Sequence, residues 1–367
     1  MRHETGKYST AAARWAGVGP YYAMFPTAFA EKVIATYTRC GDSILDPFAG
    51  RGTAIFSAAV HDRVGLGVEI NPVGWVYSQA KLNPASEDEV AERFKELWKV
   101  SRRYRRAAES MPPFFGFCYQ PNVLQFLLAA RSLLNWRIRK TDWTAMALLL
   151  INLHGKREAA LSNQMRQTKS MSPGYAINWW KARKLDPPEV EPLEFMLKRT
   201  EWRYAKGIPK ATPSRAYLGD STRLLTRISR YWGSNHKRAR LLLTSPPYLG
   251  ITNYHYDQWL RLWLLGGPPT SRRPGGLYRG KFENKHQFRM LLHNVFTSAK
   301  PLLARDATIY VRTDGRSLTR GITMEVLREV FPTRQLHYRR RPYNAPTQTT
   351  LFGHDAPSLG EVDLVLS

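Results

Sequence analysis

A glycine-rich turn between two strand-like segments constrains the fold of this chain more than any other feature. Residues 43–48 have the apolar pattern of a buried strand, and residues 49–53 form a loop that leads into a helix ending near Ala59. Residues 64–69 resemble a second strand, and Pro72 begins another helix. Strands that alternate with helices pair in parallel through right-handed crossovers. This start therefore predicts an α/β fold with a parallel sheet.

The alternation stops after this start and resumes near residue 211. Residues 83–210 show only helical patterns and loops, including a capping box formed by Ser86 and Glu89. We therefore predict a Rossmann-like, seven-stranded α/β sheet with a helical insertion between strands 2 and 3. The last two strands lie close enough in sequence to pair as an antiparallel hairpin. The five later strands are predicted at 215–220, 240–244, 307–312, 334–339 and 361–366.

The glycine loop has the chemistry of a cofactor site. Ligands of open α/β sheets bind beyond the carboxyl ends of the strands, where this loop lies. Gly50 and Gly52 allow the backbone to bend sharply and to approach a ligand closely. Glu69, at the tip of the second strand, is placed to accept hydrogen bonds from two ribose hydroxyls, and Asp46 can pair with an ammonium group. The alternative is a tight structural turn with a capping acid.

A second motif, Ser245-Pro-Pro-Tyr248, follows the predicted fourth strand. Two consecutive prolines hold the backbone extended and rigid, which suits a reaction that depends on fixed geometry. The Ser245 hydroxyl and the Pro246 carbonyl could accept hydrogen bonds from the two N–H groups of an amine and so increase its nucleophilicity. Tyr248 offers a flat face on which an extruded base could stack. In isolation, the motif could also be an ordinary turn.

Composition restricts the partners. The chain has 55 Lys+Arg against 29 Asp+Glu, a net charge of +26. This excess favours a polyanionic partner, although a solvated basic surface is the alternative. The longest apolar run, residues 145–153, is too short to span a bilayer, and residues 1–13 have no apolar signal core. Neither the two cysteines nor the nine histidines have metal-ligand spacing. We expect a cytoplasmic protein that needs neither a metal nor a membrane.

Five short segments together resemble the motifs of the DNA amino-methyltransferases, which modify cytosine N4 or adenine N6. Residues 45–53 resemble motif I of that family and residues 243–248 resemble motif IV. Residues 21–26, 67–72 and 219–220 resemble motifs X, II and III. The resemblance implies that S-adenosyl-L-methionine is the cofactor and that Ser245, Pro246, Pro247 and Tyr248 are catalytic. It implies a cofactor-binding set of Tyr22, Phe25, Pro26, Asp46, Pro47, Phe48, Ala49, Gly50, Gly52, Thr53, Glu69, Ile70, Asp220 and Ser221. Asp220 alone could equally be a helix N-cap.

The family resemblance also suggests the target. Members with SPPY usually modify cytosine N4 after base flipping, whereas DPPY or NPPY usually accompanies adenine N6. Cytosine carbon-5 chemistry requires a cysteine nucleophile, normally in a Pro-Cys pair, but Cys40 follows Arg39 and Cys118 follows Phe117. We therefore expect a site-specific DNA cytosine-N4 methyltransferase, with a cognate restriction endonuclease as a candidate partner. The alternatives are an adenine-N6 enzyme, an RNA or protein amide methyltransferase, and a catalytically silent nucleic-acid-binding module.

The motif order X, I, II, insertion, III, IV most resembles the α arrangement of the family. It predicts a catalytic domain from residues 1–82 and 211–367, and a target-recognition region at 83–210. Each basic or aromatic cluster could be a solvated face or a DNA contact. The clusters are Arg102, Arg103, Arg105 and Arg106; Arg137, Arg139 and Lys140; residues 163–167; residues 179–181; residues 254–259, which could instead form a buried helical face; and residues 339–343.

Overall fold

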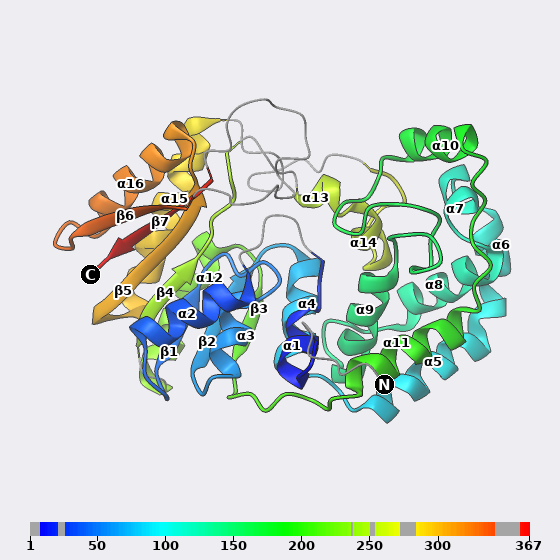
Figure 1. Ribbon diagram of the computed structural model, residues 1–367, viewed down its shortest axis with the longest axis horizontal. Helices are drawn as coiled ribbons and strands as arrows, with labels where there is room; N and C mark the ends of the chain where they lie inside the picture. The colour runs from blue at the N-terminus through cyan, green and yellow to red at the C-terminus, as the bar shows by residue number, and fades with distance from the viewer. Residues whose placement is uncertain (1–7, 21–25, 236–237, 250–253, 272–283, 342–359) are drawn as a thin grey trace. The chain divides into compact units, whose positions relative to one another are not determined.

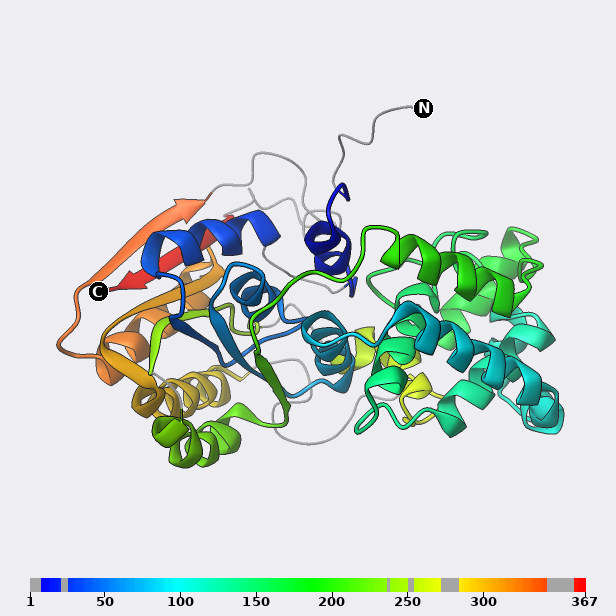
Figure 2. The same cartoon turned by 90° about the horizontal axis from the view of Figure 1, so that it is seen from below.

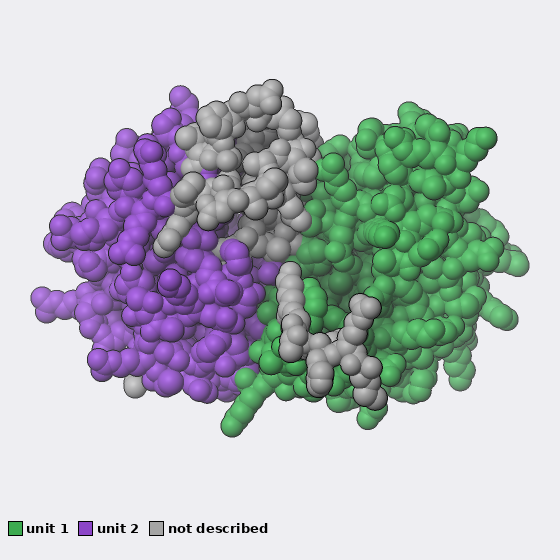
Figure 3. All heavy atoms as spheres, viewed as in Figure 1, with its two compact units in different colours: residues 1–21, 72–210, 254–275 green, residues 22–71, 211–253, 276–367 purple. Residues whose placement is uncertain are grey.

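A computed structural model describes residues 8–20, 26–235, 238–249, 254–271, 284–341 and 360–367. The chain divides into two compact units, coloured separately in Figure 3. The sheet unit comprises residues 22–71, 211–253 and 276–367, and the helical unit comprises residues 1–21, 72–210 and 254–275.

The sheet unit contains seven strands in the order β3-β2-β1-β4-β5-β7-β6 (Figure 1). Parallel pairing joins β3, β2, β1, β4 and β5, whereas β7 is antiparallel to both β5 and β6. This confirms the predicted seven-stranded sheet and the antiparallel pairing of the last two strands. The strands are β1 Ser43–Asp46, β2 Val64–Glu69, β3 Arg215–Leu218, β4 Ala239–Thr244, β5 Leu303–Asp314, β6 Leu336–Arg341 and β7 Glu361–Leu366.

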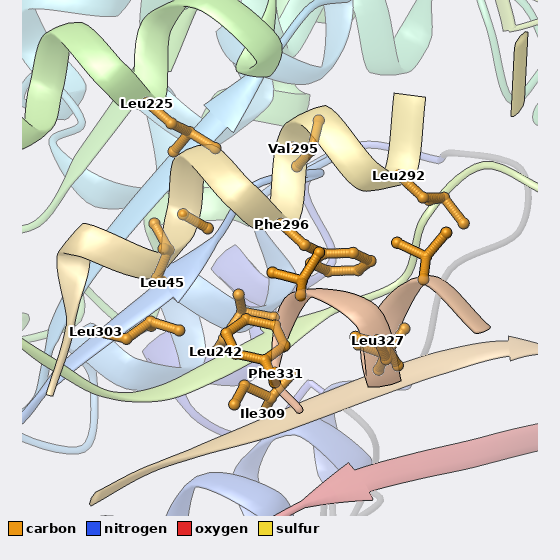
Figure 4. Close-up of a cluster of buried hydrophobic side chains, with 14 of the residues drawn as sticks. Leu45, Leu225, Leu242, Leu292, Val295, Phe296, Leu303, Ile309, Leu327 and Phe331 are labelled. Atoms are coloured by element: carbon orange, nitrogen blue, oxygen red, sulfur yellow. The ribbon is translucent and has the colours of Figure 1, made fainter. Parts of the chain in front are cut away.

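Helices cover both faces of the sheet (Figure 2). On one face α2 and α3 pack through Val33, Ile34 and Ala58 onto the apolar side chains of β1 and β4. On the other, α12, α15 and α16 bury a larger apolar cluster against the central strands (Figure 4). The helices of this unit are α2 Thr27–Tyr37, α3 Thr53–Ala59, α12 Ser221–Asn235, α15 Lys285–Ala299, the 3-10 turn η2 Lys300–Leu302 and α16 Ser317–Val330.

The strand order reverses between β1 and β4. From β1 the chain proceeds outward through β2 to β3, and it then returns to β4 on the other side of β1. Neighbouring parallel strands whose connections leave in opposite directions open a crevice at their carboxyl ends, where open α/β sheets bind ligands. The predicted cofactor loop follows β1, and the SPPY motif follows β4. The topology therefore brings the two motifs to the same point.

The helical unit is built around buried aromatic side chains. Phe114 and Phe115 on α7 contact Trp180, Trp259 and Trp263 with ring centroids 4.5–6.4 Å apart. The predicted capping box of Ser86 and Glu89 is present at the start of α5. Its helices are α1 Ala11–Ala16, α4 Pro72–Leu82, α5 Glu87–Ser101, η1 Arg102–Tyr104, α6 Arg105–Glu109, α7 Pro113–Cys118, α8 Pro121–Leu133, α9 Lys140–Asn152, α10 Pro173–Ala182, α11 Pro192–Tyr204, α13 Tyr254–Asp257 and α14 Trp259–Leu264.

The helical unit extends beyond the predicted insertion. It also includes α1, α4 and the segment with α13 and α14 that follows the SPPY motif in sequence. The aromatic contacts of Trp259 and Trp263 explain the last of these additions, and they favour a buried helical face for these two residues. None of the described helices is both long and apolar enough to cross a membrane.

Candidate functional site

The glycine loop after β1 has the backbone that its sequence requires. Gly50 and Gly52 have φ angles of 54° and 75°, in the left-handed region that side chains disfavour. A Cβ placed on Gly50 would meet no atom of the described residues within 4 Å, so none of these residues covers this side of the glycine. The Gly52 amide donates to the Ala49 carbonyl at 2.7 Å, which closes the turn before α3. The loop thus presents bare backbone where a ligand could approach.

Glu69 at the end of β2 holds this loop through its carboxylate. Its Oε2 accepts a hydrogen bond from the Gly50 amide at 2.6 Å, and its Oε1 accepts one from the Asn71 amide at 2.7 Å. The side chain is buried, and burial raises the pKa of Glu69 from 4.5 to about 8, with a smaller contribution from the charge of Asp46. The Ile70 amide also hydrogen-bonds this carboxylate, which has about four acceptor positions in all, so a position remains for a ligand hydroxyl.

Asp46 at the end of β1 connects the loop to the SPPY strand. Its Oδ1 accepts hydrogen bonds from the Thr244 hydroxyl at 2.6 Å and from the Phe48 amide at 3.1 Å. No described residue donates a hydrogen bond to Oδ2. Burial raises the pKa of Asp46 from 3.8 to about 7. A buried carboxylate with an open acceptor would be stabilised by a cationic or hydroxyl-bearing ligand.

The end of β3 also reaches this point. The Ser221 hydroxyl donates to the Pro47 carbonyl at 2.5 Å, and the Gly219 amide donates to the Glu69 backbone carbonyl at 2.9 Å. Asp220 Oδ1 accepts from the amide and the hydroxyl of Thr222 at 2.9 and 2.8 Å. Asp220 therefore caps α12, as the alternative interpretation expected, and its contact with a cofactor stays a prediction.

The SPPY segment continues β4 without regular secondary structure. Ser245 is half-buried, and no described residue forms a hydrogen bond with its hydroxyl. Tyr248 is only 5% exposed, and its hydroxyl donates to Glu361 Oε1 on β7 at 3.2 Å. The tyrosine ring is therefore a packed side chain rather than the exposed platform that the motif alone suggests.

The other predicted cofactor residues differ in their environment. Thr53 and Ala49 are buried, whereas Phe48 and Ile70 are partly buried. Pro26 is exposed and precedes α2 as its N-cap. Tyr22 and Phe25 lie outside the described residues. In the part of the chain that the structure describes, no group of histidine, cysteine or acidic side chains could hold a metal ion.

The predicted DNA contacts in the helical unit divide into exposed and buried groups. Arg102, Arg103, Arg105 and Arg106 are all exposed. In contrast, Asn163 is fully buried and donates to the Phe117 and Leu185 carbonyls, and buried Trp180 donates to the Gln164 carbonyl at 2.7 Å. The prediction that Asn163 or Trp180 reads bases is therefore wrong, because both side chains are buried and donate their N–H groups to backbone carbonyls.

Three residues that contact the two motifs were not predicted from the sequence. Thr244 bridges the two motifs, and Arg316 and Glu361 contact the segment that follows the prolines. Thr244 directly precedes SPPY, so its position at a strand end was a usable signal. Arg316 and Glu361 are distant in sequence, and only the pairing of β5 with β7 brings them together.

Comparison with known proteins bears on the cofactor half of this site. Residues 2–81 match the model of the DNA methylase family of N6 and N4 type. Over these residues the chain is similar to the DNA amino-methyltransferases. The Type II methyltransferase M.Cfr9I of Citrobacter freundii is 41% identical over 54 residues. That alignment covers 15% of this chain and 18% of the relative, so the chain spans less than a fifth of the relative's length.

Solved structures show only a distant likeness to this chain. The rRNA methyltransferase aviRa from Streptomyces viridochromogenes superposes with a TM-score of 0.36 and 12% sequence identity, over 98% of this chain and 96% of that one. A second structure of the same enzyme gives a TM-score of 0.31 and 11% identity, over 85% and 84% of the two chains. Scores this low carry no argument about function.

Proposed function

We propose that this chain is a DNA methyltransferase that uses S-adenosyl-L-methionine to methylate an exocyclic amino nitrogen, with cytosine N4 as the target. One observation carries the proposal. The 2.6 Å hydrogen bond between Thr244 and Asp46 joins the strand that precedes SPPY to the strand that precedes the cofactor loop. Because the bond lies where the strand order reverses, it unites the ligand-binding crevice of the fold with the acceptors suited to an amine.

The residues at this crevice fit the proposed cofactor. The ligand has ribose hydroxyls, an ammonium group and a cationic sulfonium, and Asp46 and Glu69 are buried carboxylates with remaining acceptor positions. None of the described residues covers the Cβ side of Gly50, so none of them hinders approach to its backbone there. When bound, the cofactor supplies an electrophilic methyl group. Asp46 and Glu69 would hold it, and Asp220 and Ser221 complete the proposed contacts around the loop.

Ser245 and Pro246 would prepare the nucleophile. The lone pair of an exocyclic base amine is delocalised into the ring, which makes the amine a poor nucleophile. The Ser245 hydroxyl and the Pro246 carbonyl would each accept one N–H of that amine and return electron density to nitrogen. Pro246 and Pro247 fix these acceptors, and fixed geometry supplies much of the acceleration in a direct displacement. Base flipping would bring the amine to these acceptors, and the packing around Tyr248 would have to open for its ring to contact the face of the base.

The choice of cytosine rests on family association. Two acceptors and an aromatic ring suit the amino group of either cytosine or adenine. Serine at position 245, where adenine enzymes usually carry an acid or an amide, favours cytosine N4. The comparisons support a methylase of N6 or N4 type, which is consistent with both bases.

DNA as the polyanion agrees with the charge of the chain and with exposed arginines on the helical unit. The net charge is +26, and Arg102, Arg103, Arg105 and Arg106 are exposed near the junction of η1 and α6. Phosphate contacts of this kind provide sequence-independent affinity. We propose that residues 83–210 form the target-recognition region and that residues 1–82 and 211–367 carry catalysis.

Transfer of a labelled methyl group tests this function. Purified protein is incubated with methyl-labelled S-adenosyl-L-methionine and genomic DNA from a methylation-free host, with bulk RNA as competitor. We expect label in DNA and little effect of RNA. Ser245→Ala should abolish most of the incorporation, whereas Ser110→Ala, at an exposed serine of the helical unit, should leave it unchanged. Label in RNA alone, or none in either polymer, would contradict the proposal.

A further inference from the structure

The two residues that directly follow the SPPY prolines are hydrogen-bonded to side chains at one end of the β5–β7 strand pair. Tyr248 donates its hydroxyl to Glu361 Oε1 at 3.2 Å, and the Leu249 carbonyl accepts from Arg316 Nη2 at 2.5 Å. Glu361 begins β7, and Arg316 follows the end of β5. Two consecutive residues of the loop are therefore connected to one end of an antiparallel strand pair.

Glu361 is itself held by a buried arginine. Arg312 Nη1 lies 3.3 Å from Glu361 Oε2, and the same guanidinium forms a two-pronged pair with Asp363 at 2.7 and 3.0 Å. The guanidinium carbon also lies 3.3 Å from the ring centre of Phe29 on α2. Planar two-pronged pairing fixes the orientation of both partners. The carboxylate that receives the tyrosine hydroxyl thus has little freedom to move.

Arg316 is fixed in the same manner. Its Nη2 and Nε donate to the two carboxylate oxygens of Asp314 at 2.7 and 3.2 Å, and Asp314 is buried. Asp314 lies opposite Glu361 in the antiparallel register, so the two supports share one end of the β5–β7 pair. The Gly315 amide closes this end by donating to the Gly360 carbonyl at 2.9 Å.

We propose that Glu361 and Arg316 are positioning residues that fix the SPPY segment relative to the sheet. Pro246 and Pro247 make the segment stiff, but stiffness within the segment does not set the direction of Ser245 or of the Tyr248 ring. Two tethers immediately after the prolines set both. The inference rests on the proposed function, since it assigns the tethers the task of keeping the amine acceptors in reacting geometry. Misplacement by about 1 Å can cost a hundredfold in rate.

Four variants test the two hydrogen bonds that hold Tyr248 and Leu249. Tyr248→Phe keeps the ring but removes the hydroxyl, and Glu361→Leu removes its acceptor. Glu361→Gln keeps an acceptor oxygen, and Arg312 stays paired with Asp363 in this variant. Arg316→Met removes the second tether. Glu329→Leu is the matched control, because it removes an exposed carboxylate from an ion pair with Arg289 elsewhere in the same unit.

The first measurement is hydrogen exchange by mass spectrometry of the full-length protein with S-adenosylhomocysteine present. We expect amide exchange in the peptide spanning residues 243–249 to accelerate about tenfold in Tyr248→Phe, Glu361→Leu and Arg316→Met. Exchange in the β2 peptide should be unchanged. Unaltered exchange at 243–249 in these three variants would overturn the inference, whatever the protein methylates.

The second measurement is steady-state methyl transfer. Tyr248→Phe and Glu361→Leu should each lower kcat about tenfold while KM for the cofactor stays within about twofold. Their double variant should be no slower than the slower single variant, because both remove the same contact. Glu361→Gln should recover most of the rate. A purely structural role predicts equal losses in Glu361→Gln and Glu361→Leu, or a parallel loss of cofactor affinity, and either result would overturn the inference.

The two measurements separate this inference from the proposed function. Absence of methyl transfer by the wild-type protein would contradict the proposed function, and the exchange result would then decide the tether alone. Normal transfer by all variants, together with wild-type activity, would contradict only the positioning role.

Discussion

A buried arginine of the helical unit differs in kind from two buried carboxyls of the sheet unit. In the helical unit, Arg261 is fully buried and donates to the Leu150 carbonyl, Gln258 Oε1 and the Gln167 carbonyl at 2.9, 2.6 and 2.5 Å. In the sheet unit, Asp46 and Glu69 are equally hidden, but burial raises the pKa of each carboxyl to about 7 and about 8. The arginine completes a packed core, whereas the two carboxyls carry an uncompensated cost of burial.

This difference separates buried groups that stabilise the fold from buried groups that could bind a ligand. A buried group that the fold fully satisfies adds stability and specificity to the fold. A buried pair of carboxyls with raised pKa values at the carboxyl ends of parallel strands is a candidate for ligand binding, because a cation or hydroxyl donor would compensate the desolvation. We therefore propose that the sheet unit binds the cofactor and carries catalysis, and that the exposed arginines of the helical unit bind a polyanion.

The sharpest test of this division is Ser245→Ala. The serine hydroxyl acts mainly on the reacting amine, so its loss should lower the rate of methyl transfer about a hundredfold. Cofactor affinity, measured by calorimetry, should stay within about twofold, because the hydroxyl forms no bond with the described cofactor residues. Full activity in this variant would show that SPPY is only a turn.

Glu69→Ala tests the proposed cofactor site of the sheet unit. The glutamate positions the Gly50 and Asn71 amides and would accept ribose hydroxyls, so its removal should weaken cofactor binding by about 1.5–3 kcal/mol. Calorimetric titration measures this directly. An affinity within twofold of wild type would place the cofactor elsewhere.

The raised pKa values predict a dependence of stability on pH. Because the folded pKa values of about 7 for Asp46 and about 8 for Glu69 exceed the ordinary values of 3.8 and 4.5, the folded state holds extra protons between these limits. Stability contributed by the protonated carboxyls is complete below about pH 4 and is lost as the pH rises to 8. Thermal unfolding of the wild type and of Asp46→Asn/Glu69→Gln, each scanned from pH 5 to 9, tests this linkage.

The free energy of unfolding of the double variant should rise relative to that of the wild type by about 2 kcal/mol per pH unit as the pH rises from 5 to 8. Subtraction of the two curves cancels the pH response of the other charged groups. If the stabilities of the two proteins changed in parallel with pH, Asp46 and Glu69 would titrate normally. Their burial would then carry no cost that distinguishes them from Arg261.

The smallest effect is expected in the helical unit. Replacement of Arg102, Arg103, Arg105 and Arg106 by glutamine should reduce the slope of log affinity against log salt by about 0.9 for each lost phosphate contact. Cofactor affinity should not change. Fluorescence anisotropy of a labelled duplex between 50 and 200 mM salt measures the slope, and an unchanged slope would shift the DNA surface to the exposed Arg339 and Arg340.

The sheet unit was more predictable from sequence than the helical unit, for physical reasons. Its glycine loop and proline pair are local features whose backbone conformations depend on consecutive residues. The first two strands, predicted at 43–48 and 64–69, are present at Ser43–Asp46 and Val64–Glu69.

Long-range contacts set the limit of prediction. The Tyr248–Glu361 and Leu249–Arg316 contacts depend on strand pairing between segments that are distant in sequence. The membership of α4 and of residues 254–275 in the helical unit depends likewise on packing that no local pattern encodes. Long-range contacts also explain why the prediction for Asn163 was wrong. Its side-chain amide, which could have read bases, donates instead to two backbone carbonyls within the fold.

The identity of the methylated nucleoside tests the central claim most directly. DNA treated with the protein and S-adenosyl-L-methionine is digested to nucleosides and analysed by mass spectrometry. We predict N4-methylcytosine, because Ser245 and Pro246 suit an exocyclic amine and serine at this position accompanies cytosine in the family. N6-methyladenine as the sole product would contradict the cytosine assignment but retain amino methylation. Because 5-methylcytosine requires a cysteine nucleophile that SPPY lacks, its appearance would contradict the entire account.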